Sequence, residues 1–70
     1  MVKIFLNRIR TERKMSARTL SYLSGVSKTH IINIENGKNS PTIECLCKLS
    51  QALDVDIYEL FSCQGENSEE

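Results

Sequence analysis

The side chains of this 70-residue chain that could do chemistry are hydrogen-bonding groups on one predicted helix face. If this segment is helical, Ile31 and Ile34 mark its buried side, Thr29 and Asn33 fall nearly opposite them, and Lys28 at the N-terminus is free to swing outward. A lysine amine can donate to guanine O6 or N7, and an asparagine amide can pair bidentately with adenine. A threonine can make a mixed polar and methyl contact. The pattern therefore predicts a surface suited to the base edges of DNA.

Two further side chains of this segment are predicted to touch DNA. His30 lies beside the inward face, where a phosphate or a flanking base is within its reach; the alternative is a partly buried polar histidine. Ile32 lies at the outer edge, as an exposed isoleucine on a polar face. Packing against a thymine methyl explains it, although single apolar residues are common on surfaces.

The sequence lacks the residues that catalysis or metal binding would require. There is one histidine, no glycine-rich phosphate loop and no pairing of a nucleophile with a base, so we expect no enzyme, cofactor or small-molecule substrate. Cys45 and Cys47, two apart on a helix, face opposite ways and cannot share a metal. We expect Cys47 in the core and Cys63 exposed, with redox sensing by Cys63 as a minor alternative. An odd number of cysteines without an export signal favours free thiols and the cytoplasm.

The net charge of zero hides a strong asymmetry along the chain. Residues 1–38 hold eight of the nine basic residues and two acidic ones, a formal charge of +6, and the remainder carries −6. Such a chain has one half suited to a polyanion and another that repels it. The simpler interpretation is an uneven spread of ordinary solvated charges.

The spacing of apolar and turn residues predicts an all-α fold of five short helices without strands. No apolar run is long enough for a membrane span, and the start does not resemble a secretory signal. The domain is expected to cover residues 1–61, and residues 62–70 are expected to form a flexible acidic tail. The helices are predicted at residues 3–13, 16–24 (capped by Ser16, with Leu20 and Leu23 on one face), 28–35 (capped by Ser27), 42–53 (capped by Thr42, with Leu46, Leu49 and Leu53 inward) and 56–61 (with Asp56 and Glu59 at capping-box spacing).

Two of these helices are joined by so few residues that they must cross steeply. Ser21 is the small residue where they touch, Gly25 ends the first helix, and Val26, Ile31 and Ile34 pack the second onto the body. A small residue followed by glycine at +4 and apolar residues at +5, +10 and +13 is a helix-turn-helix spacing.

Over residues 6–61 the chain resembles the lambda-repressor-like, Cro/C1-type (XRE-family) DNA-binding domains of bacteria and phages. The resemblance implies a small transcriptional regulator, a repressor, that binds double-stranded DNA with its third helix in the major groove. Ala17 departs from the glutamine frequent in the family, and Lys14 from a glycine. The matching landmarks are Ile9-Arg10, Met15-Ser16, Leu20, Gly25-Val26-Ser27, Ile31, residues 34–37, Pro41 and Ala52-Leu53.

The resemblance also suggests roles for residues around the third helix. Arg10 and Glu35 are expected to form an ion pair that supports the fold rather than touching DNA. Phosphate contacts set register without reading sequence. The loop that follows the third helix is expected to supply some of them, with a solvated turn as the alternative. The predicted phosphate contacts are Arg13, Ser16, Arg18, Ser27, Asn36, Lys38, Asn39 and Ser40.

A single module of this size buries only about 600–1,000 Å² on DNA, so selective binding suggests a homodimer on a two-fold site. We expect its interface at Ile43, Tyr58 and Phe61.

A protein-interaction or antitoxin-like module with the same fold is the alternative function, favoured by Ala17, whereas the polar outer face of residues 28–36 favours DNA. A nonspecific nucleoid binder is a third option.

Overall fold

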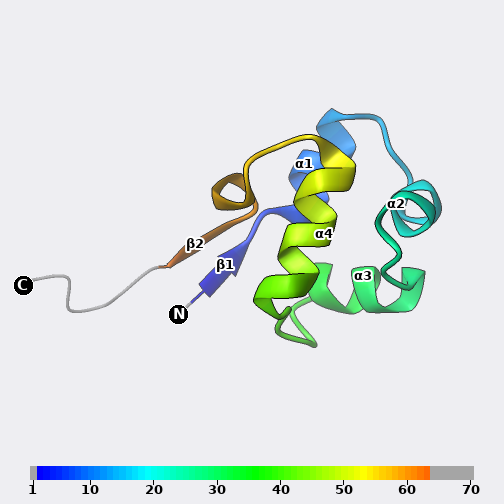
Figure 1. The fold of residues 1–70 in the computed structure, drawn as a ribbon. Helices are drawn as coiled ribbons and strands as arrows, with labels where there is room; N and C mark the ends of the chain where they lie inside the picture. Colours follow the sequence, from blue (N-terminus) through cyan, green and yellow to red (C-terminus); the bar gives the residue numbers. More distant parts are fainter. Residues whose placement is uncertain (1, 64–70) are drawn as a thin grey trace, which may run out of the picture.

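Four α-helices surround a single core in a computed structural model that describes residues 2–63 (Figure 1). The second, third and fourth helices have almost the predicted bounds, because each has a capping residue and an apolar stripe. The elements are β1 (Val2–Ile4), α1 (Leu6–Glu12), α2 (Ala17–Ser24), α3 (Lys28–Glu35), α4 (Ile43–Leu53), the 3-10 turn η1 (Ile57–Glu59) and β2 (Phe61–Cys63).

The two ends of the described chain correct the prediction of five helices without strands. Residues 3 and 4 belong to β1 rather than to the first helix, and the predicted fifth helix is only the single turn η1 followed by β2. The predicted tail begins inside a strand, since Ser62 and Cys63 belong to β2, and residues 64–70 lie outside the described residues.

β1 and β2 form a two-stranded antiparallel sheet, here called the ribbon, whose pairs are Val2 with Cys63, Lys3 with Ser62 and Ile4 with Phe61. Alternating residues of a strand point to opposite faces. The ribbon therefore has an apolar face made by the outer two pairs and a polar face made by the central pair. The period-two alternation is present in the sequence, but each segment has only three residues and its partner lies almost sixty residues away.

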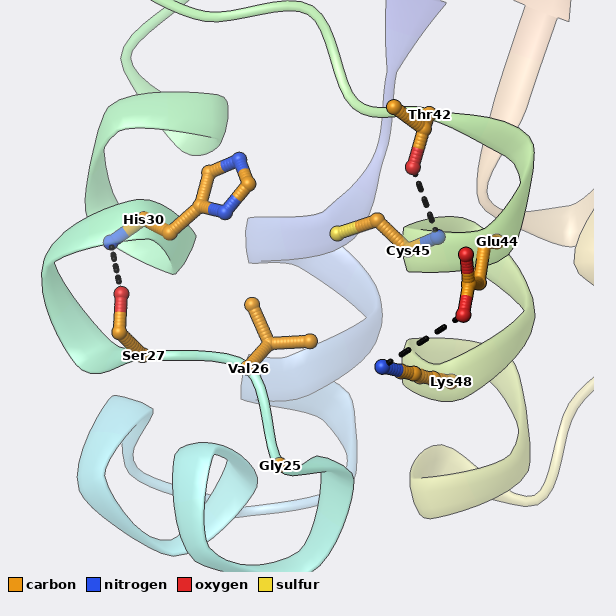
Figure 2. A pocket seen from close by; sticks show the side chains of 8 residues that line it. All are labelled: Gly25, Val26, Ser27, His30, Thr42, Glu44, Cys45 and Lys48. Atoms are coloured by element: carbon orange, nitrogen blue, oxygen red, sulfur yellow. Dashed lines mark hydrogen bonds and ion pairs between the residues drawn. The ribbon is translucent and has the colours of Figure 1, made fainter.

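The predicted N-caps are confirmed. The hydroxyl oxygens of Ser16, Ser27 and Thr42 each accept a hydrogen bond from the backbone amide three residues later, at 3.0, 3.1 and 3.0 Å (the last two in Figure 2). Gly25 ends α2 in the left-handed conformation, with φ of 79°, as predicted. The Glu59 carboxylate accepts from the Asp56 amide at 3.3 Å, as capping-box spacing predicts, although only one 3-10 turn follows.

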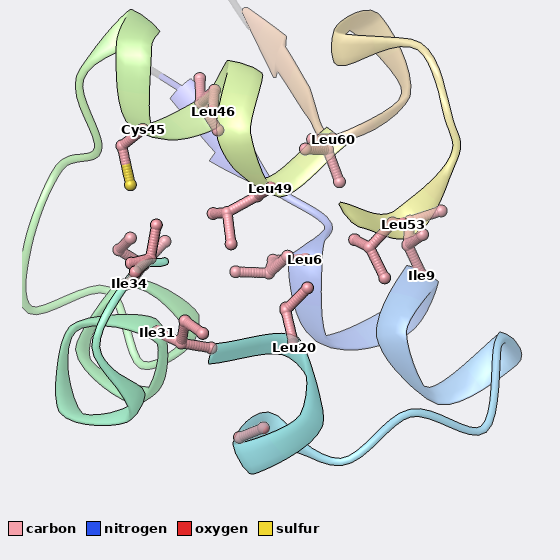
Figure 3. Packing of buried hydrophobic residues seen from close by; sticks show 12 residues of the cluster. Leu6, Ile9, Leu20, Ile31, Ile34, Cys45, Leu46, Leu49, Leu53 and Leu60 are labelled. Atoms are coloured by element: carbon pink, nitrogen blue, oxygen red, sulfur yellow. The ribbon is translucent and has the colours of Figure 1, made fainter. Parts of the chain in front are cut away.

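The core is built where α1, α2, α3 and α4 meet (Figure 3). Leu6, Leu20 and Leu49, one each from α1, α2 and α4, are completely buried. Leu46, Leu49 and Leu53 point inward as predicted. Leu23 does not share the inward face of Leu20, because it lies in the last turn of α2 and is 53% exposed.

Lys14, in the connection from α1 to α2, has a strained backbone. Its φ is 55°, a left-handed conformation that costs a non-glycine residue about 1–2 kcal/mol. We expect Lys14→Gly to raise the free energy of unfolding by about 1 kcal/mol, after the extra freedom of glycine in the unfolded chain is subtracted. Urea denaturation measures this. Lys38→Gly is the control, because Lys38 is an exposed loop lysine outside the left-handed region; an equal change in both variants would contradict the explanation.

Candidate nucleic-acid interface

α3 exposes one side and buries the other. Ile31 and Ile34 are almost completely buried against the other helices, whereas Lys28 and Thr29 are exposed. Asn33 is half-buried, and its backbone carbonyl accepts a hydrogen bond from the Lys38 amide at 2.8 Å. The exposed face therefore carries Lys28 and Thr29, Asn33 is only partly open to solvent, and the loop after α3 is tied to the same helix.

The structure corrects the placement of Ile32 and locates His30. Ile32 is half-buried and packs against the core, so it is not the exposed isoleucine of the prediction and its apolar character needs no partner outside the chain. His30 is also half-buried, on the side of α3 that faces α4 (Figure 2).

The predicted phosphate contacts lie in three exposed places around α3. Arg13, Ser16 and Arg18 lie before and within the first turn of α2, and Ser27 lies at the start of α3. The rest form the loop after α3, which turns at Gly37 with φ of 77°. These loop residues are Asn36, Lys38, Asn39 and Ser40, all exposed.

Arg10 and Glu35 form the predicted ion pair, and it does more than join two helices. Arg10 Nε and Nη2 donate to the two carboxylate oxygens of Glu35 at 2.8 and 3.0 Å, and Nη1 donates to the Met15 carbonyl at 3.0 Å. The Glu35 carboxylate also accepts from Asn7 Nδ2 at 3.3 Å. The hydrogen bonds to Glu35 raise the pKa of Arg10. One guanidinium thus fixes the end of α3 to α1 and to the chain just before α2.

The predicted dimer residues lie together on another surface. Ile43 and Phe61 line one apolar groove between α4 and the ribbon, and the ring centre of Tyr58 is 6.3 Å from that of Phe61. Ile43 and Tyr58 are 68% and 79% exposed. The structure adds Val2, an exposed residue of β1 that sequence reasoning placed before the first helix.

The thiols are placed differently from the prediction. Cys45 is buried and Cys47 is exposed, because α4 turns its 45, 46, 49 and 53 positions toward the core. Cys63 is exposed, as predicted. Burial raises the pKa of the Cys45 thiol. Among residues 2–63 no three histidine, cysteine or acidic side chains gather as a metal site would require, and no helix is long and apolar enough to cross a membrane.

The fold and the exposed third helix agree with the comparison to known families. The family model described as helix-turn-helix matches residues 6–60. The chain belongs to the Cro/C1-type helix-turn-helix family. The resemblance found in the sequence is therefore confirmed over almost the same residues.

Relatives of this helix-turn-helix protein include two uncharacterized HTH-type transcriptional regulators of Sinorhizobium fredii. The chain is 40% identical to y4dL over 52 residues, which are 74% of this chain and 26% of y4dL. It is 34% identical to y4dJ over 59 residues, 84% of this chain and 77% of y4dJ. The chain thus spans about a quarter of one relative and about three quarters of the other.

A solved structure shows the same arrangement of helices. The restriction-modification controller protein C.AhdI from Aeromonas hydrophila superposes with a TM-score of 0.75 at 31% identity, over 77% of this chain and 82% of that chain. The mostly helical helix-turn-helix fold of this protein is therefore shared with that controller.

Proposed function

We propose that this protein is a repressor that binds specific double-stranded DNA sequences as a homodimer, with α3 in the major groove. The observation that carries the proposal is the exposed face of α3, where Lys28 and Thr29 are open to solvent beside Asn33. Recognition helices place N-terminal and outward side chains on base edges. Ile32 is half-buried, so only its outer edge can contact a thymine methyl. His30 is also half-buried and is proposed to contact a phosphate or a flanking base.

The surroundings of α3 support phosphate contacts on the same side. Ser16 and Arg18 begin α2, Ser27 begins α3, and the exposed loop with Asn36 and Lys38 follows it. Helix N-termini favour anions, and contacts of this kind set register. Binding to DNA requires the protein to work where the DNA is, which in a bacterium is the cytoplasm.

A second copy is proposed to dock at the surface formed by Ile43, Tyr58 and Phe61. Exposed large apolar side chains that gather in one place mark interaction surfaces. This surface includes the groove beside Gly37, just past the C-terminal end of α3, so pairing there would set two α3 helices end to end on neighbouring half-sites about one helical turn apart.

Selection of bound sequences from random duplexes at near-physiological salt tests the proposal. We expect a two-fold symmetric site of two half-sites, and a sedimentation mass of two chains on a duplex carrying it. Enrichment of no sequence, with binding to all duplexes, would favour a nonspecific binder instead. No binding to any duplex would favour the protein-interaction alternative, which the exposed Tyr22 and Leu23 of α2 support.

A further inference from the structure

A polar hollow of about 260 Å³ lies between α3 and α4, next to the helix proposed to read DNA (Figure 2). His30 enters it from α3, and Glu44, Cys45 and Lys48 enter it from α4. None of the α4 residues was predicted to have a role. The hollow is open to solvent along one side and is therefore accessible to a large ligand.

Between its buried and exposed faces α3 has two flanks, one carrying Glu35 and the other His30, and the hollow lies on the His30 flank. At about 100° per residue, Glu35 and His30 project from opposite sides of the helix. The Glu35 side is bound to Arg10, which also holds the Met15 carbonyl just before α2. The His30 side borders the hollow. A helix with its side chains is about 10–12 Å wide and the major groove is about 12 Å wide. In the proposed complex the His30 flank, unlike the Glu35 flank that Arg10 covers, is therefore open toward a phosphate chain.

Both helices begin at this hollow, and their first turns contribute partial positive charge. Ser27 caps α3 and Thr42 caps α4, and each cap satisfies one amide of its first turn. The other amides of a first turn have no partner within the helix. Together with the helix dipole they favour a negatively charged group.

Lys48 supplies the full positive charge of the hollow and is only loosely held. Its Nζ lies 3.9 Å from Glu44 Oε2, and the two side chains are 51% and 82% exposed. A pair this exposed contributes little to stability, so exchange of its partner costs little.

The side chain of Cys45 adds no negative charge to the hollow. It is 7% exposed and points into the space, and within residues 2–63 no protein group hydrogen-bonds its thiol. Burial raises the pKa of this thiol and the Lys48 charge partly opposes the rise, so burial favours the neutral thiol. Glu44 is then the one full negative charge that lines the hollow.

We propose that this hollow binds a phosphodiester of the duplex that α3 reads, and that Lys48 leaves Glu44 for that phosphate. The inference rests on the proposed function. Glu44 is then a competitor for the bound phosphate, which lowers the affinity for every DNA sequence by a similar factor, because a phosphate contact carries no sequence information.

Three variants test the exchange by titration with the selected duplex and with an unrelated one. Glu44→Gln is expected to tighten binding to both about threefold, since it removes the competing charge near a phosphate. Lys48→Gln placed in the Glu44→Gln background is expected to weaken binding about fivefold and to reduce the salt slope by about 0.9, the value for one phosphate contact. Single Lys48→Gln is expected to bind most weakly, because it leaves Glu44 without a partner.

The matched control is the exposed pair Arg8–Glu12 on α1, which has the same spacing and the same 3.9 Å separation. Glu12→Gln, alone and with Arg8→Gln, is expected to leave both affinities within twofold. If Lys48→Gln changes nothing in the Glu44→Gln background, Lys48 only neutralises Glu44 and the inference is wrong. It is also wrong if inorganic phosphate alone shifts the amide resonances of α4 as strongly as the duplex does, because the site then serves a small anion. Failure of the unsubstituted protein to bind any duplex would instead contradict the proposed function.

Discussion

Arg10→Met is expected to lower the free energy of unfolding by about 3 kcal/mol, the largest single effect that we anticipate. The substitution leaves the Glu35 carboxylate, 5% exposed, without its bidentate partner. It also removes the donor to the Met15 carbonyl. A domain of this size has a total stability of about 4–10 kcal/mol, so a large part of the population would unfold on mild heating. Thermal and urea denaturation measure the loss.

Two further variants separate the buried pair from an ordinary surface charge. Arg8→Met removes an exposed arginine of the same helix, which pairs with Glu12 and stacks on the Phe5 ring at 4.9 Å, and its cost should stay below about 1 kcal/mol. Arg10→Met combined with Glu35→Leu should recover part of the stability, because no charge then remains buried alone. Equal losses in Arg10→Met and Arg8→Met would show that the pair does not hold α3 in place.

Asn33→Ala is expected to reduce binding to the selected DNA site about tenfold or more and to relax the preference at one adenine. Lys28→Ala should do the same at one guanine. Selection from random duplexes, repeated with each variant, measures both effects. Because the bonds from Asn33 to the loop after α3 use its backbone carbonyl, the alanine variant keeps that loop in place.

Asn36→Ala is the control for base reading, since Asn36 is an exposed residue past the end of α3 and is proposed to contact phosphate. It should weaken binding to all sequences alike, without changing the preferred bases. If neither Asn33→Ala nor Lys28→Ala changes the preferred bases, the assignment of α3 as the reading helix is wrong.

Local signals in the sequence were sufficient for α2, α3 and α4. Ser16, Ser27 and Thr42 mark where these helices begin, and Gly25 marks an end, because each acts on its immediate neighbours. The ribbon could not be predicted in this way. Its strands are too short to be recognised singly, and their pairing depends on how the helices between them bring the ends together.

The candidate site was predictable where one helix carries it and not where two helices meet. The exposed face of α3 follows from its own periodicity, whereas Ile32 lies near the boundary of that face and its burial depends on what packs beside it. No role was assigned to Lys48 from the sequence, because only the crossing of α3 and α4 places it in one hollow with His30. An i, i+4 spacing such as that of Glu44 and Lys48 indicates by itself no more than a surface ion pair.

Pairing the first and last described segments also makes their local opening a single event. When β1 separates from β2, both strands lose their cross-strand hydrogen bonds together, while the helices between them stay folded. Native-state hydrogen exchange should therefore show the amides of the ribbon exchanging as one cooperative unit, before those of the helices. Since Val2, Ile4, Phe61 and Cys63 form one wall of the apolar groove, a partner bound there would slow that exchange.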